Sequence, residues 1–158
     1  VELLDTPNRE HSLRSALAAV ESDYAYILLD CPPSLGLLTV NALVATQAVI
    51  IPVQCEYLAL EGVARLTDTI GRVRANLNPR LRIFGLLMTM YDRRTSLSDQ
   101  VAQEVRRYYP ELTFRTVIPR SVRLGEAPSF GVPILEYDPR SSGARAYCAL
   151  ATEVASRG

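Results

Sequence analysis

The sequence predicts an α/β fold in which helices cover both faces of a parallel β-sheet. Three short segments, residues 26–29, 48–53 and 83–88, are apolar without a break and have about the length of a strand. Continuous apolar runs are typical of strands that are buried on both faces, as in parallel sheets. The segments between them repeat apolar residues every three or four positions, which is the spacing of an amphipathic helix. Strands that alternate with helices predict crossover connections and a parallel, doubly covered sheet.

Each element is predicted from its own residues. Between Leu60 and Leu77 the apolar positions form one stripe, with arginines turned outward. Ser96 can cap a helix that Pro110 ends. The segment Pro119–Pro133, rich in Pro, Gly and Ser, is expected to be a ligand-binding loop at the carboxyl end of a strand. The predicted order is helix 10–21, strand 26–29, helix 37–46, strand 48–53, helix 60–77, strand 83–88, helix 96–109, strand 113–118 and helix 142–156, with a further strand considered at 1–4.

Length and composition predict a single domain over residues 1–158 of a cytoplasmic protein. A hydrophobic fraction of 48% without low-complexity runs argues against disorder. No apolar run approaches the roughly 18 residues that a transmembrane helix needs. The three cysteines, at positions 31, 55 and 148, are far apart and form no C-x-x-C pair. This spacing argues against a disulfide framework or a zinc site and fits a reducing compartment.

The charges are unevenly distributed although the net charge is zero. All 17 basic residues are arginines, and the chain has no lysine. Residues 65–123 contain 12 arginines and five acidic residues, whereas the rest of the chain contains five arginines and 12 acidic residues. A basic middle segment suggests an anionic partner, nucleic acid or nucleotide. The alternative is a solvated, arginine-rich surface without a partner.

The first candidate functional residue is Asp30, which follows the apolar run 26–29 and precedes Cys31-Pro-Pro-Ser-Leu-Gly36. A carboxylate at the carboxyl end of a buried strand is suited to orient Mg²⁺, often through a water, or to position an attacking water. The alternative is an aspartate that only organises the turn with its side chain.

Two further strand ends carry polar side chains. Asp92 follows the apolar run 83–88, and Arg120 follows the strand 113–118. Because the carboxyl ends of parallel strands meet at one edge of the sheet, a single crevice is expected to hold Asp30, Asp92 and Arg120. Ordinary loop chemistry remains the alternative for each of these residues.

Four blocks together resemble the ParA/Soj family of chromosome- and plasmid-partitioning ATPases. They are LLDCPPSLGLLTVNAL, PVQCEYLALEGVARL, NPRLRIFGLLMTMYDRRT and VIPRSVRLGEAPSFGVPI, and they stand in the family's order with natural spacing. The resemblance extends from about Asp23 to the end of the chain. It implies the deviant-Walker P-loop NTPase type of α/β fold, of which this chain would be the C-terminal portion without the N-terminal P-loop unit.

The resemblance also implies roles for individual residues. Asp30 is expected to be catalytic, to contact the nucleotide and to hold Mg²⁺ through water. The remaining assignments are the nucleotide-binding residues Met90, Asp92, Pro119 and Arg120, and the DNA-binding residues Arg94 and Arg123. Both DNA-binding arginines lie inside the basic segment, so the charge distribution agrees with their assignment. Guanidinium contacts to phosphates need no base specificity and weaken steeply with salt.

The family implies ATP and Mg²⁺ as cofactors, an ATP-bound homodimer, non-specific DNA and a ParB-type partner as binding partners, and a nucleoid-associated location in the cytoplasm. The chain departs from the family because it contains no lysine and no glycine-rich loop of the form G-x-x-x-x-G-K-[ST]. ATP and Mg²⁺ are therefore expected only together with an N-terminal segment, and the chain alone is not expected to turn over ATP. The end of the chain lacks the basic amphipathic extension of membrane-recruited relatives, so no membrane partner is expected. The alternative function is a non-catalytic DNA- or protein-binding module of the same fold.

Overall fold

The computed structural model describes residues 8–32, 34 and 36–157. The chain divides into two compact units, one from Val1–Val49 with Leu66–Arg82 and the other from Ile50–Arg65 with Ile83–Gly158. The prediction of a single domain stays a prediction. No helix that the structure describes is both long and apolar enough to cross a membrane.

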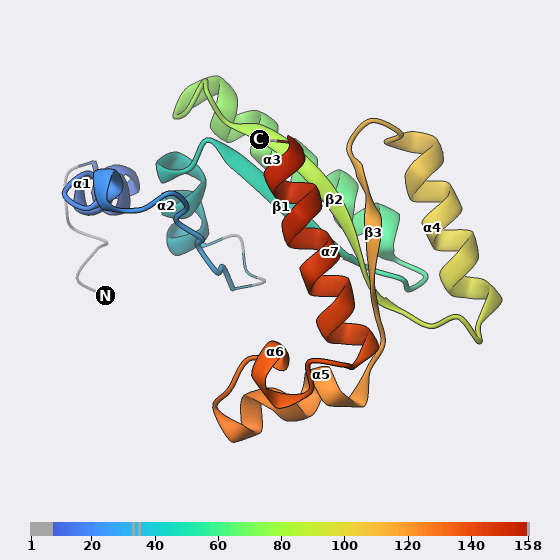
Figure 1. The fold of residues 1–158 in the computed structure, drawn as a ribbon. Helices are drawn as coiled ribbons and strands as arrows, with labels where there is room; N and C mark the ends of the chain where they lie inside the picture. The colour runs from blue at the N-terminus through green and yellow to red at the C-terminus, as the bar shows by residue number, and fades with distance from the viewer. Residues whose placement is uncertain (1–7, 33, 35, 158) are drawn as a thin grey trace. The chain divides into compact units, whose positions relative to one another are not determined.

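Strands and helices alternate along most of the chain, as Figure 1 shows. In chain order the elements are η2 (Arg9–His11), α1 (Ser12–Leu17), η3 (Glu21–Asp23), α2 (Leu37–Ala45), β1 (Ala48–Gln54), α3 (Ala59–Asn76), β2 (Arg82–Tyr91), α4 (Ser96–Tyr108), β3 (Thr113–Pro119), α5 (Val122–Glu126), η4 (Ala127–Phe130), α6 (Ile134–Tyr137) and α7 (Ser142–Arg157), where η marks a 3-10 helix.

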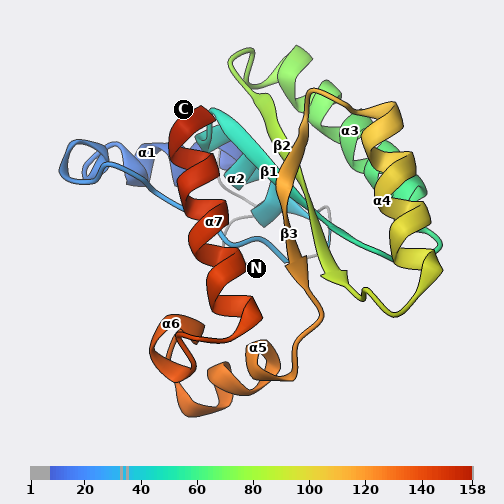
Figure 2. The ribbon, with the colours of Figure 1, turned by 45° about the vertical axis from the view of Figure 1, so that its right-hand side comes forward.

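The described strands form one sheet with the order β1-β2-β3. β2 and β3 are parallel, and their register pairs Leu86 with Thr113 and Tyr91 with Pro119. Helix α4 connects the two strands in the chain and lies on the opposite side of them from α7 (Figures 1 and 2). The prediction of a parallel α/β sheet with helices on its faces is confirmed.

In the unit formed by Ile50–Arg65 and Ile83–Gly158, helix α7 packs along β3, and an apolar core lies between them (Figure 2). Phe114 is fully buried and belongs to one apolar cluster with Leu87 and Ile118, against which Leu150 and Val154 of α7 pack. Polar contacts hold the end of the same helix. The Glu153 carboxylate accepts hydrogen bonds from the backbone N–H groups of Arg115 (2.8 Å) and Thr116 (2.9 Å). Arg157 donates to Glu153 at 2.7 Å and to the Thr113 carbonyl at 3.0 Å.

In the other unit, buried asparagine side chains join separate segments. The Asn41 amide donates to the Arg9 carbonyl at 2.9 Å, and its oxygen accepts from the Leu13 N–H at 3.1 Å. Asn78 donates to the carbonyls of Leu43 (2.9 Å) and Thr46 (2.6 Å), near the end of α2. These bonds satisfy backbone groups that helix ends leave without partners inside the helix.

The predicted strand Tyr26–Leu29 is wrong. These residues are not in a strand, and the side chains of Tyr26 and Leu28 are 68% and 88% exposed. A strand is held by backbone bonds to a neighbouring strand and by burial of its side chains. Sequence periodicity reports the apolar residues but cannot report whether a partner strand is there.

Two smaller predictions also need correction. The helix predicted at 10–21 is shorter, since α1 ends at Leu17 and is flanked by the 3-10 turns η2 and η3. The segment predicted as a loop, Pro119–Pro133, contains α5 and η4. The strand considered at 1–4 lies outside the described residues.

Candidate functional site

The carboxyl ends of β2 and β3 bring four of the predicted site residues to one edge of the sheet. Tyr91 pairs with Pro119 in the register, and the Arg120 N–H donates to the Tyr91 carbonyl at 2.9 Å. Met90 and Asp92 therefore lie beside Pro119 and Arg120. This is the edge at which open parallel sheets bind ligands.

Met90 has an unusual backbone conformation at this edge. Its φ of 53° lies in the left-handed region, which few residues other than glycine adopt. Such backbone outliers persist only where the surrounding structure holds them, and they cluster at functional sites. The conformation of Met90 thus favours a functional role for the end of β2.

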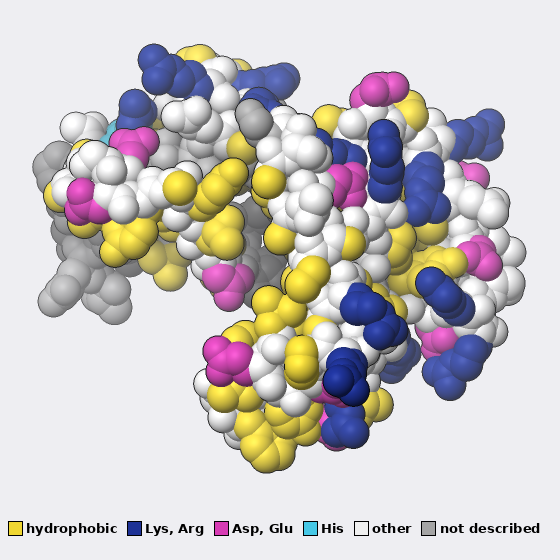
Figure 3. All heavy atoms as spheres, in the orientation of Figure 1, with side chains coloured by type: hydrophobic (Ala, Val, Ile, Leu, Met, Phe, Trp, Pro, Cys, Tyr) yellow, Lys and Arg dark blue, Asp and Glu magenta, His cyan; other side chains and the backbone are white. Residues whose placement is uncertain are grey.

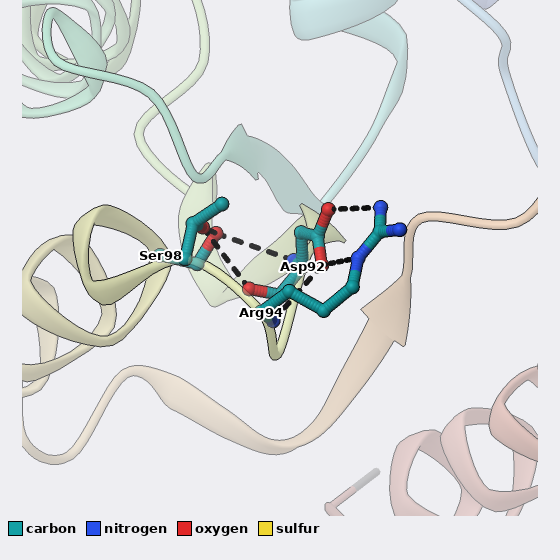
Figure 4. Close-up of polar contacts among 4 residues, drawn as sticks. Asp92, Arg94 and Ser98 are labelled. Atoms are coloured by element: carbon teal, nitrogen blue, oxygen red, sulfur yellow. Dashed lines mark hydrogen bonds and ion pairs between the residues drawn. The ribbon is translucent and has the colours of Figure 1, made fainter.

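Asp92 and Arg94 form a two-pronged ion pair in the turn after β2 (Figure 4). The Arg94 Nε donates to Asp92 Oδ1 at 2.9 Å, and its terminal nitrogen donates to Oδ2 at 2.7 Å. The Arg94 backbone N–H also donates to Oδ1, at 3.0 Å. These hydrogen bonds hold the pKa of Asp92 well below its ordinary value. They also raise the pKa of Arg94, so both groups stay charged.

The start of α4 fixes Asp92 in place. Its backbone N–H donates to the Ser98 hydroxyl at 3.2 Å, and its carbonyl accepts from the Thr95 hydroxyl at 3.1 Å (Figure 4). Tyr91 donates a hydrogen bond to Asp99, also on α4. The Asp92 side chain is only 15% exposed, whereas that of Arg94 is 85% exposed. The carboxylate is therefore the enclosed partner of the pair and the guanidinium the exposed one.

Arg123 on α5 also faces carboxylates. It lies 3.0 Å from Glu126 and 3.6 Å from Asp138, and its guanidinium lies over the Tyr137 ring at 5.9 Å. The hydrogen bond to Glu126 is the main cause that raises the pKa of Arg123. Around α5 and α6, Figure 3 shows arginine and acidic side chains next to an apolar surface. Val122 and Phe130 are among the exposed apolar residues there.

Asp30 belongs to the other compact unit, formed by Val1–Val49 with Leu66–Arg82. It is exposed, in a segment that forms neither helix nor strand. Within the described part of the chain, no cluster of three or more His, Cys, Asp or Glu side chains could hold a metal ion. Asp30 thus offers a single exposed carboxylate, and no such cluster surrounds it among the described residues.

Comparison with known proteins identifies the family. A family model described as an AAA domain matches residues 1–83. The sporulation initiation inhibitor protein Soj of Bacillus subtilis is 56% identical over 158 residues, which are 100% of this chain and 62% of that protein. The chromosome partitioning protein ParA of Caulobacter vibrioides is 54% identical over 99% of this chain and 60% of that protein. The chain belongs to the AAA-domain family, and it is similar to Soj and ParA proteins along its whole length.

The resemblance of the sequence to the ParA/Soj family is thereby confirmed. The chain spans about three fifths of the length of these ParA/Soj relatives. A crystal structure of cobyrinic acid a,c-diamide synthase from Mycobacterium smegmatis, with bound ATP analog and magnesium, is 39% identical. It matches with a TM-score of 0.77 and covers 96% of this chain and 55% of that one. The sheet is therefore a part of the P-loop NTPase fold.

The residues of this chain meet only some of the requirements of a site for ATP and Mg²⁺. Asp30 offers an exposed carboxylate for the metal, and Met90, Pro119 and Arg120 lie at the ligand-binding edge of the sheet. The Asp92 carboxylate is occupied by Arg94. The chain supplies no lysine for the phosphates. The described residues thus fit the base side of a nucleotide site better than its phosphate side.

Sequence reasoning missed the carboxylates that hold the two arginines. It assigned Asp92 and Arg94 to separate ligands and gave Glu126 and Asp138 no role. The spacing of Arg123 and Glu126, three positions apart on one helix, is a signal that could have found one pair.

The sequence analysis also missed a cavity of about 150 Å³ between the start of α3 and α4. It is lined by Glu56, Tyr57, Ala59, Leu60, Leu97, Gln100, Val101 and Glu104.

Proposed function

We propose that this chain is part of a ParA/Soj-type ATPase that binds ATP and Mg²⁺, dimerises, binds DNA without sequence preference and segregates chromosome or plasmid DNA with a ParB-type partner. The observation that carries the proposal is the 56% identity to Soj over the whole chain. The chain spans about three fifths of the length of such relatives. Their role in partitioning is proposed here for the protein of which this chain is a part.

The proposed DNA contacts are made by Arg94 and Arg123. Both side chains are more than half exposed and belong to the arginine-rich middle of the chain. A guanidinium donates to phosphate oxygens without reading bases, so binding is non-specific and falls with salt. Such binding would associate the protein with the nucleoid in the cytoplasm.

The proposed nucleotide contacts are made by Met90, Asp92, Pro119 and Arg120, with Asp30 orienting Mg²⁺ through water. The register of β2 and β3 supports the grouping of the first four, since it pairs Tyr91 with Pro119. When bound, Mg²⁺ neutralises phosphate charge and makes the terminal phosphate easier to attack. A glycine-rich loop with a lysine would have to complete the phosphate side of the site.

The test of the DNA surface is the double substitution Arg94→Ala/Arg123→Ala. Removing the phosphate contacts of two arginines from B-DNA binding should flatten the slope of log affinity against log salt by about 1 to 2 and weaken binding at low salt. Fluorescence polarisation with a non-specific duplex measures both quantities. The matched control is Arg74→Ala/Arg80→Ala, which removes two exposed arginines from the same basic segment. If both double variants lose the same DNA affinity, Arg94 and Arg123 have no special role in DNA binding.

A second candidate is a DNA- or protein-binding module that uses this fold without catalysis. The observation that favours it is the complete absence of lysine from the 158 residues. This candidate predicts DNA retention that is sensitive to salt and does not depend on ATP. The ATPase candidate predicts that DNA retention depends on ATP when the whole nucleotide site is present.

A further inference from the structure

The Arg94 guanidinium already has a bound anion in this structure. Asp92 occupies its Nε and one terminal nitrogen, at 2.9 and 2.7 Å. A guanidinium binds a carboxylate and a phosphate through the same planar fork of N–H donors. Asp92 therefore takes the Nε edge of Arg94, one of the two edges that can bind a phosphate with two hydrogen bonds, and its charge opposes the attraction of a phosphate.

The two partners differ in their freedom to move. Asp92 is held through its backbone by Ser98 and Thr95, and its side chain is largely buried. Arg94 is attached by a long side chain and is mostly exposed to solvent. Exchange of anions at this site requires Arg94 to leave Asp92, because Asp92 cannot follow it.

We propose that Asp92 is an intramolecular competitor for phosphate, so that the Nε edge of Arg94 contacts DNA only after it has left the Asp92 carboxylate. The inference rests on the proposed DNA binding of Arg94 and adds a restraint to it. Exposed ion pairs are weak, so the exchange lowers DNA affinity by a modest factor and does not abolish binding. Asp92 thus does not contact DNA itself. It influences the affinity for DNA and the salt dependence of that affinity through Arg94.

The substitution Asp92→Asn isolates the charge. Its amide oxygen still accepts the Arg94 backbone N–H, so the turn is kept while the ion pair is lost. We expect the 158-residue variant to bind a non-specific duplex about two- to fivefold more tightly at low salt, the range that exposed ion pairs are worth. The slope of log affinity against log salt should steepen by up to about 1, because the Arg94 contact, which competes with Asp92 in the wild type, then forms fully.

Two variants separate this effect from a change in net charge. Glu104→Gln on α4 removes one carboxylate from a looser exposed pair, with Arg107 at 3.8 Å, and should leave the slope unchanged. Asp92→Asn/Arg94→Ala should lose the gain of Asp92→Asn. A gain that persists without Arg94, or that Glu104→Gln reproduces, would overturn the inference. DNA binding that Asp92→Asn leaves unchanged or weaker would also overturn it and leave the proposed function standing.

A second measurement does not depend on DNA. Carboxyl carbon NMR titration of the wild-type chain and of Arg94→Ala follows the Asp92 carboxyl group directly. We expect the pKa of Asp92 to rise towards its ordinary value in Arg94→Ala, because the hydrogen bonds from Arg94 keep it low. The same pKa in both proteins would reject the ion pair and with it the inference. DNA binding by none of the variants would instead reject the proposed function.

Discussion

At the scale of single residues, the three cysteines differ in their surroundings. Cys31 and Cys148 are exposed, whereas Cys55 is buried. Burial raises the pKa of Cys55 to about 11, from an ordinary value of 9.0. Because the thiolate is the reactive form, a shift of this size lowers its amount about 100-fold at neutral pH.

We therefore expect an aromatic disulfide reagent at pH 8 to modify two thiols of the native chain and to reach the third only after unfolding. Absorbance of the released thiolate, read with and without urea, measures both phases. Cys55→Ser should remove the slow phase and keep the fast one. Three thiols that react in one fast phase would contradict the burial of Cys55.

The pairing of Asp92 with Arg94 illustrates which residue-level features the sequence could predict. The apolar run before Asp92 predicts a strand, and the end of a strand predicts exposed polar side chains. Two side chains at positions i and i+2 contact each other only in certain turns, and that turn depends on bonds to Thr95 and Ser98. The position of the site could be predicted, whereas its ion pair could not.

At the scale of elements, β2 and β3 approach closely at Gly85. A Cβ atom added there would lie 2.4 Å from the buried Phe114 ring and 3.0 Å from the Leu112 carbonyl oxygen. We expect Gly85→Ala to lower the free energy of unfolding by about 1–3 kcal/mol, the usual cost of overpacking a core. Urea denaturation followed by circular dichroism measures this change.

The matched control for Gly85→Ala is Gly71→Ala inside α3, where an added Cβ meets nothing within 4 Å. Alanine restricts the unfolded chain and favours a helix, so this variant should be more stable by about 0.5–1 kcal/mol. Opposite signs for the two variants are expected. A loss of stability in both would mean that the close approach at Gly85 is not the cause.

The contact between α7 and β3 depends on pH through Glu153. Burial raises the pKa of Glu153, but the bonds from Arg115, Thr116 and Arg157 outweigh it and lower the pKa from 4.5 to about 2. A carboxyl group with a lowered pKa in the folded state stabilises the fold above its unfolded pKa. That stabilisation should be complete above about pH 5 and disappear as the pH falls towards 2.

We expect Glu153→Gln to lose roughly 1.5–3 kcal/mol of unfolding free energy at pH 7, the value of hydrogen bonds to a charged group. The difference from wild type should shrink as the pH falls from 5 to 2. Thermal unfolding at several pH values checks this expectation. Glu136→Gln, an exposed carboxylate on α6, controls for the loss of one negative charge. A difference that does not depend on pH would contradict the role of the Glu153 charge.

Most helices and strands could be predicted because they bury an apolar face. The periodicity between Leu60 and Leu77 corresponds to α3, and the apolar run 83–88 lies inside β2. The run 26–29 is as continuously apolar as the run 83–88 but forms no strand. Whether residues 26–29 form a strand depends on a neighbouring strand from elsewhere in the fold. A local sequence pattern carries no information about that neighbour.

At the scale of the whole molecule, the question is whether nucleotide changes DNA binding. None of the eight glycines stands in a G-x-x-x-x-G-K-[ST] loop, and no lysine is available to meet the terminal phosphates. A ligand that does not distinguish two states of a protein cannot shift it between them. We therefore expect the affinity of the 158-residue chain for a non-specific duplex to be the same, within about twofold, with and without MgATP.

Fluorescence polarisation at one low salt concentration, with ATP, ADP or no nucleotide, measures this affinity, and phosphate release measures turnover. Arg94→Ala/Arg123→Ala should weaken binding equally under all three conditions, because its loss comes from phosphate contacts alone. A tenfold gain with ATP, or turnover above the buffer, would contradict the expectation. Asp30 is the candidate Mg²⁺ ligand, and its carboxylate is exposed. Asp30→Ala would then test whether this carboxylate supports nucleotide binding without a glycine-rich loop.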